Sequence, residues 1–261
     1  MTQLLLGAKV DVNAKNMLGL SALHHACLLG EAATAKLLLA APGVDVNMLA
    51  GGKLAATALD LVIYRAMGGQ IRGVNEIDHL GDVNPRASTE ETVELIKVLA
   101  SAPNINMNCK EAEYVTWHGQ SGTPLECAVQ LQSVPVLEAL LRAPGIDVNA
   151  RGRSGAPLHL ASSPEIAQLL LAVPEIDANL KEAPRSGTGW ERTPLHIAAQ
   201  KDNVELVKVL VASPKVDVNA RDRDGMTALR LAQLLDTSQA MQEILREAGA
   251  TAASKRALNP E

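Results

Sequence analysis

The segment TPLHIAAQ, residues 193–200, decides the fold, because variants of it recur along the whole chain. A threonine followed by a proline is typical of a helix start. The threonine caps the helix, and the proline takes the first helical position, where its missing N–H loses no hydrogen bond. A short helix rich in leucine and alanine is expected to follow. The copies of this segment also show whether His196 has a chemical or a structural role.

Six segments share the pattern, at spacings of 36, 66, 33, 37 and 34 residues. They begin at Ser21, Thr57, Thr123, Ala156, Thr193 and Thr227. A second motif, rich in Asp and Asn, alternates with the first, as in DVNA at 147–150 and 217–220. Two interleaved motifs with a shared period near 34 residues indicate stacked repeats.

Each repeat is predicted to contain two helices. In the fifth copy, apolar residues at helical spacing follow the polar turn residues Asp202 and Asn203 and predict a second helix over 204–212. That helix ends at Ser-Pro, and an Asp- and Asn-rich turn lies beyond it. The repeat is therefore helix, turn, helix and extended loop.

These repeats resemble ankyrin repeats, whose pattern has a Thr-Pro-Leu-His start and a period of about 33 residues. The resemblance covers residues 3–250 and implies an all-α solenoid of about six helix-turn-helix units with projecting β-hairpin-like fingers. A partial unit at 3–10 precedes the array, and a flexible tail at 251–261 follows it. The expected units are 11–44, 45–103, 104–146, 147–176, 177–216 and 217–250.

The resemblance also implies a structural histidine near the start of the first helix. That position holds His24, His159 and His196 in three copies, and Asp60, Glu126 and Arg230 in the others. Because carboxylates and arginine replace the imidazole, no histidine chemistry is needed there. We interpret these side chains as partners for the free N–H groups of the helix start.

Composition excludes several classes of function. The net charge of −5 and the pI near 5.7 disfavour nucleic acid. Phenylalanine is absent and aromatic residues make up 2%, so the core must consist of Leu, Val, Ile and Ala. No apolar run is long enough to cross a membrane. Cys27, Cys109 and Cys127 lie far apart without a CxxC pair, which favours a cytoplasmic or other reducing intracellular compartment.

No catalytic constellation is evident. The patterns GxxxxGK[ST], GxGxxG, GxSxG and HExxH are all missing from the sequence. His24, His25 and Cys27 share a helical segment, but no fourth metal ligand lies nearby. We therefore expect no enzyme activity, no cofactor and no metal.

Two units depart from the regular length. The second unit carries an insertion at 67–88 between its helices, whose apolar residues could dock on a partner or pack on their own repeat. These residues are Ile71, Val74, Ile77 and Leu80. The fourth unit is short, with only 21 residues from Ala156 to Asp177, and most of a helical turn is expected to be missing near 162–165.

Two fingers are lengthened, at 107–122 and 180–192, and each contains one of the only two tryptophans, Trp117 and Trp190. Tyr114 and His118 accompany Trp117. Large aromatic residues are enriched at the centres of protein interfaces, so we predict partner contacts here. The alternative, in which each ring folds over a neighbouring helix, stays open at this point.

The fingers of the last three units carry an excess of basic residues, seven against four acidic ones. Arginine binds carboxylates in a bidentate manner, so the excess favours an acidic peptide segment in the partner. An ordinary solvated surface is the alternative. The basic residues are Arg151, Arg153, Lys181, Arg185, Arg192, Arg221 and Arg223.

The first apolar residues, Leu4, Leu5 and Leu6, would expose an apolar edge if nothing covered them. Either further sequence or another subunit would then cover this edge.

Taken together, these features predict a non-catalytic protein-interaction module or assembly subunit that binds another protein or peptide through its concave face and lengthened fingers. The competing hypothesis is a targeting or substrate-recognition domain of a larger enzyme or bacterial effector.

Overall fold

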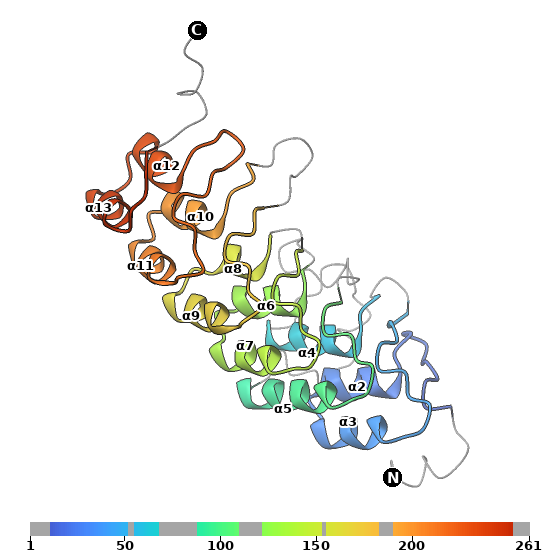
Figure 1. Ribbon diagram of the computed structural model, residues 1–261. Helices are drawn as coiled ribbons and strands as arrows, with labels where there is room; N and C mark the ends of the chain where they lie inside the picture. Colours follow the sequence, from blue (N-terminus) through green and yellow to red (C-terminus); the bar gives the residue numbers. More distant parts are fainter. Residues whose placement is uncertain are drawn as a thin grey trace. The chain divides into compact units, whose positions relative to one another are not determined.

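The computed structural model describes residues 11–51, 55–67, 88–109, 122–152, 155–182 and 190–252 (Figure 1). Over these residues the secondary structure is helical, with no β-strand and one isolated antiparallel bridge between Gly152 and Gly155. The predicted all-α class is therefore confirmed. The hairpin form of the fingers stays a prediction.

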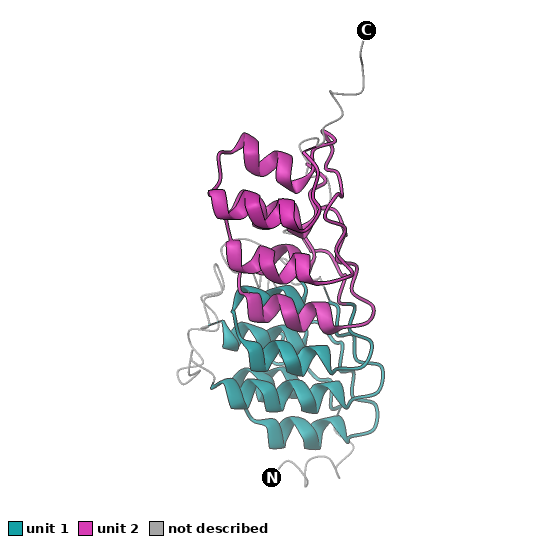
Figure 2. Cartoon of the chain, turned by 60° about the vertical axis from the view of Figure 1, so that its left-hand side comes forward, with its two compact units in different colours: residues 1–147 teal, residues 148–261 magenta. Residues whose placement is uncertain are grey.

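The chain divides into two compact units, residues 1–147 and 148–261 (Figure 2). The division falls next to the boundary predicted between the third and fourth repeats. A single array over 3–250 stays a prediction.

Unit 1 contains three pairs of helices among its described residues. The first helices are α2 (Ala22–Leu29), α4 (Ala58–Ala66) and α6 (Pro124–Gln130). The second helices are α3 (Ala32–Leu39), α5 (Thr89–Ala100) and α7 (Val134–Leu141). Each first helix packs on the next first helix, and each second helix on the next second helix, so that the pairs form a two-layered stack.

Unit 2 repeats this arrangement. Its first helices are α8 (Pro157–Leu160), α10 (Pro194–Gln200) and α12 (Ala228–Leu234). Its second helices are α9 (Pro164–Ala172), α11 (Val204–Ala212) and α13 (Gln239–Glu247). Helix α10 packs between α8 and α12, and α11 packs between α9 and α13. The helix-turn-helix repeats predicted from the sequence are confirmed in both units.

The hydrogen bonds at the helix starts explain why different residue types can occupy the histidine position. In α4 the carboxylate of Asp60 accepts hydrogen bonds from the N–H and the hydroxyl of Thr57, both at 2.8 Å. In α10, Nδ1 of His196 takes the same place, 3.4 Å from the N–H and 2.8 Å from the hydroxyl of Thr193. A side chain with an acceptor at this point closes the first turn, which confirms the structural interpretation for the histidines and the acids. Arg230 has no acceptor, and the start of α12 is capped instead by the hydroxyl of Thr227, which accepts from the N–H of Arg230 at 3.3 Å.

Two of the imidazoles also join neighbouring repeats, whereas the buried Nε2 of His159 has no hydrogen-bond partner among the described residues. Nε2 of His24 lies 2.9 Å from the carbonyl oxygen of Met48, and Nε2 of His196 lies 2.9 Å from that of Met226. Burial lowers the pKa of His24, His159 and His196, so all three favour the neutral form. They lie at the starts of three different helices, α2, α8 and α10.

A ladder of asparagines links successive loops. The side-chain N–H2 of each donates to a carbonyl of the next loop at 2.7–3.2 Å, and its oxygen accepts a backbone N–H two residues further on at 2.7–2.9 Å. The six are Asn13, Asn47, Asn108, Asn149, Asn179 and Asn219. The Asp- and Asn-rich motif is therefore the connection between repeats.

Replacing Asn179 by alanine is expected to destabilise the chain by about 2 kcal/mol, because the carbonyl of Lys215 and the N–H of Asp217 both lose their partner. Asn179→Asp is the matched control. It keeps an acceptor for Asp217 but loses the donor to Lys215, so about half the loss is expected. Urea unfolding followed by circular dichroism measures both. Equal stability of the wild type and Asn179→Ala would contradict the role of the ladder.

The core consists of aliphatic side chains, as composition requires. The largest fully buried side chains are leucines and isoleucines with one methionine, Met107. Small alanines fill the space between the layers, and Ala35, Ala128, Ala199 and Ala232 are all completely buried. Thin layers of this kind stack closely with few aromatic rings, and Tyr64 in α4 is a buried aromatic residue.

The insertion of the second unit falls between two helices as expected, but the position predicted for the missing turn of the fourth unit, near 162–165, is wrong. The insertion at 67–88 lies between α4 and α5. Ile71, Val74, Ile77 and Leu80 lie outside the described residues. In the fourth unit the shortening falls in the first helix, because α8 has 4 residues where α10 has 7. The segment near 162–165 keeps its cap, since the hydroxyl of Ser163 accepts from the N–H of Ile166 at 3.5 Å.

Candidate functional site

Six of the eleven predicted finger residues are described by the structure. These are Arg151, Lys181, Trp190, Arg192, Arg221 and Arg223, all in unit 2. The other predicted contacts lie outside the described residues, as do the N-terminal leucines. The finger contacts concerned are Tyr114, Trp117, His118, Arg153 and Arg185.

Two backbone hydrogen bonds hold the described segment that contains Trp190. Its carbonyl accepts a hydrogen bond from the N–H of Arg223 in the following loop, at 2.9 Å. Two residues later, the carbonyl of Arg192 accepts one from the N–H of Glu182 at 2.9 Å. The tryptophan side chain nevertheless remains 49% exposed. The ring is therefore about half accessible to a partner, and the alternative in which it packs over a neighbouring helix stays open for its covered part.

Arg192 covers one face of the exposed ring. Its guanidinium carbon lies 5.0 Å from the centre of the Trp190 ring, which is a cation–π contact. Its Nη1 donates to Oε1 of Gln200, the last residue of α10, at 2.6 Å. Its Nε is buried without a hydrogen-bond partner among the described residues. Two partners therefore hold the guanidinium in one orientation above the first-helix layer.

The neighbouring charges are largely satisfied within the loops. Lys181 and Glu191 form an ion pair at 3.4 Å. Nη1 of Arg221 donates to the carbonyl of Gly225 at 3.4 Å. The buried carboxylate of Asp222 accepts from the N–H groups of Asp224 and Met226 at 3.0 and 2.8 Å, and so shapes the loop. Several of the charges counted along the fingers therefore also have partners within the chain.

The structure brings Trp190, Arg192 and Arg223 together, whereas Arg151 lies one repeat earlier, near His159.

Sequence analysis missed Gln200 and two exposed leucines at the end of α12. Leu234 is 61% exposed and Leu235 is 48% exposed. The sequence did contain a signal for the two exposed leucines. Two leucines stand where the preceding repeat has Gln200 and Lys201.

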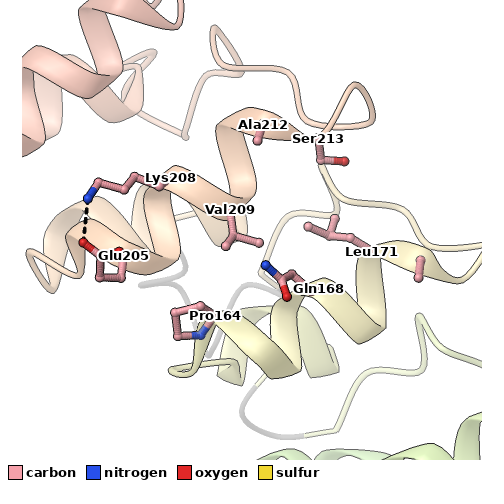
Figure 3. A pocket seen from close by; sticks show the side chains of 9 residues that line it. Pro164, Gln168, Leu171, Glu205, Lys208, Val209, Ala212 and Ser213 are labelled. Atoms are coloured by element: carbon pink, nitrogen blue, oxygen red, sulfur yellow. Dashed lines mark hydrogen bonds and ion pairs between the residues drawn. The ribbon is translucent and has the colours of Figure 1, made fainter.

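A shallow groove of about 550 Å³ lies elsewhere in unit 2, between the second helices α9 and α11 (Figure 3). Its lining is mainly apolar and includes Leu171 and Val209, with the side chain of Gln168 beside them. One edge carries the ion pair of Glu205 and Lys208, at 2.6 Å. No residue of this groove was singled out from the sequence.

The described thiols are poor nucleophiles. Burial raises the pKa of Cys27 and of Cys127 to about 12, and it also raises the pKa of Cys109. Cys109 lies against the carboxylate of Asp60, with Sγ 3.3 Å from Oδ1. Within the described ranges, no group of three or more His, Cys, Asp or Glu side chains is arranged to bind a metal.

The helices that the structure describes include none long and apolar enough to span a membrane.

Stacked helix pairs, buried capping histidines and inter-loop asparagines define a helical repeat protein. Two models of a known family match the chain, "Ankyrin repeat" over 18–50 and "Ankyrin repeats (3 copies)" over 158–255, which together make up half of its length. The chain belongs to the ankyrin repeat family, as the resemblance implied.

Curated relatives are much longer proteins. Rabankyrin-5 of Homo sapiens is 30% identical over 142 residues, which cover 49% of this chain and 12% of that protein. Neurogenic locus notch homolog protein 4 of Homo sapiens is 38% identical over 97 residues, which cover 36% of this chain and 4% of that protein. The chain thus aligns with about an eighth or less of either relative.

Solved structures share the fold. The ankyrin repeat domain of Bcl-3 has a TM-score of 0.63 at 22% identity, covering 91% of this chain and 90% of that one. The ankyrin repeat domain of human ASB11 has a TM-score of 0.55 at 22% identity, covering 96% and 93%. Ankyrin repeats are generally protein–protein interaction modules.

Proposed function

We propose that this chain is a non-catalytic interaction module that binds a protein or peptide through the concave face and fingers of its repeats, with Trp190 as an anchor. The observation that carries the proposal is a half-exposed tryptophan in a fixed frame. A rigid aromatic side chain loses little conformational entropy on binding and buries a large area, so such residues dominate interface energetics.

The surroundings of Trp190 support this role. Arg192 covers one ring face, and the exposed 49% of the side chain is free to meet a partner. In a chain with 2% aromatic residues, no aromatic core requires a tryptophan in a loop. The accessible half of the residue is available for a contact outside the fold.

Trp190→Ala is expected to weaken partner binding by more than about 2 kcal/mol, roughly 30-fold, with little change in melting temperature. The partner is identified by crosslinking mass spectrometry in native extract, and its affinity is measured with purified protein. Met17→Ala is the control, because Met17 is a fully exposed apolar residue in unit 1. Equal affinities of the wild type and Trp190→Ala would remove this anchor from the proposal.

A second candidate is a recognition domain within a larger enzyme or effector. It is favoured by the relatives, in which the matching segment makes up 12% or 4% of the protein. An antibody against the module tests it in native extract. A band near 27.5 kDa would support a separate module, and a much larger band would support a domain of a longer protein.

A further inference from the structure

We propose that the surface around Trp190 recognises a segment with a carboxylate about three residues from a large aliphatic side chain. Arg192 binds the carboxylate, and Leu234 contacts the aliphatic group. This inference rests on the proposed function and specifies its partner. The surface formed by Trp190, Arg192, Gln200 and Leu234 is called the Trp190–Leu234 strip.

The cation of the strip has no carboxylate partner of its own. Arg192 forms no ion pair within the described part of the chain. Two neighbouring acids are engaged elsewhere: Glu191 pairs with Lys181, and Asp202 accepts from the hydroxyl of Ser238 at 2.7 Å and from its N–H at 3.2 Å. Asp222 is buried and forms no ion pair with Arg192, although its Oδ2 has no hydrogen-bond partner among the described residues. The guanidinium of Arg192 is therefore available to a carboxylate of a partner.

Arg192 is also ordered before any partner arrives. The Trp190 ring and Gln200 restrict its guanidinium, so less side-chain entropy is lost when a carboxylate binds. A charge-assisted hydrogen bond from a guanidinium to a carboxylate is about twice as strong as one between neutral groups. Acidic side chains are thus favoured over neutral amides at this point.

The aliphatic end of the strip comes from the next repeat. Gln200 and Leu234 are the last residues of α10 and α12, which pack side by side (Figure 1). Leu234 is 61% exposed, and Leu235 beside it is 48% exposed. Since packed helices lie about 8–10 Å apart and an extended chain rises about 3.3 Å per residue, the acid and the aliphatic residue should be about three positions apart.

The test is selection of a phage-displayed library of random dodecapeptides on the full chain, with parallel selections on Arg192→Gln and Leu234→Ser. The wild type is expected to enrich Asp or Glu three positions from Leu, Ile or Met. Arg192→Gln should lose the acidic preference, and Leu234→Ser the aliphatic one. Circular dichroism melts check that the variants fold, and Leu37→Ser, at 37% exposure in unit 1, is the matched control.

A synthetic peptide of the enriched sequence then completes a double-mutant cycle. Replacing the Glu of the peptide by Gln should weaken binding about tenfold, and so should Arg192→Gln in the protein. Both changes together should weaken binding little more than either one alone. Arg192→Lys should restore part of the affinity. The inference would be overturned if the losses in affinity from the two changes were additive. It would also be overturned if the peptides selected on the wild type lacked Asp and Glu, or were no more enriched than those selected on Arg192→Gln. Peptides that depend on Trp190 but show no acidic preference would overturn it while leaving the proposed function standing.

Discussion

Gly19→Ala is expected to destabilise the full chain by about 3 kcal/mol or more. A Cβ atom at this position would lie 2.4 Å from the Cα of Gly51, and backbone atoms at that distance cannot move aside like a flexible side chain. Gly19 also has a φ of +75°, which favours glycine. The hydrogen bond from the N–H of Gly51 to the carbonyl of Gly19, at 2.7 Å, would be lost as the loops separate.

Gly43→Ala is the matched control in the same unit. Gly43 has a φ of +79°, yet no atom lies within 4 Å of its added Cβ, so only the backbone strain of about 1 kcal/mol is expected. Urea unfolding followed by circular dichroism separates the two effects. Equal losses in the two variants would show that the close approach of the Gly19 and Gly51 loops does not contribute to stability.

Acid is expected to destabilise unit 2 from about pH 6.5 downward, through His159 and His196. Burial lowers the pKa of both imidazoles in the folded chain, whereas the unfolded chain keeps the ordinary value near 6.5. Above that pH both states are neutral, and the histidines do not affect stability. Below it only the unfolded chain takes up protons, so unfolding becomes easier by up to about 1.4 kcal/mol per histidine and pH unit, until the folded pKa is reached.

The double variant His159→Gln, His196→Gln tests this dependence. Glutamine can accept the capping hydrogen bond in place of Nδ1 but does not titrate in this range. Urea midpoints at pH 7.5, 6.5 and 5.5 should fall less steeply for the double variant than for the wild type. Parallel profiles would contradict the role of these histidines and would assign the acid sensitivity to carboxylates.

The capping residues show why the fold was predictable from the sequence. Thr57, Thr123 and Thr193 each begin a helix where the pattern predicted one, because hydrogen bonds at a helix start involve residues only three positions apart. The insertion between α4 and α5 was located equally well. The histidine position was interpreted correctly because its replacements, Asp60 and Glu126, make the same local contacts.

The candidate site was predictable only in part. Trp190 was singled out as a rare aromatic residue in a long finger, and its exposure supports that choice. The bond between Arg192 and Gln200 was not foreseen, since nothing in the sequence indicates where two flexible side chains eight residues apart will meet. The groove between α9 and α11 depends on how closely two separate helices pack, which spacing alone does not specify.

By itself the sequence determined the number, kind and order of the repeats and the residues that cap and link them, because these depend on short-range hydrogen bonds and on a period in apolar residues. Only the tertiary structure decided which charges are satisfied internally and which side chains stay exposed. Glu191 and Asp202 are equally acidic in the sequence, but folding pairs them with Lys181 and Ser238 and leaves Arg192 without an ion pair to any described carboxylate. Such pairings form between loops and helices that meet only when the repeats stack.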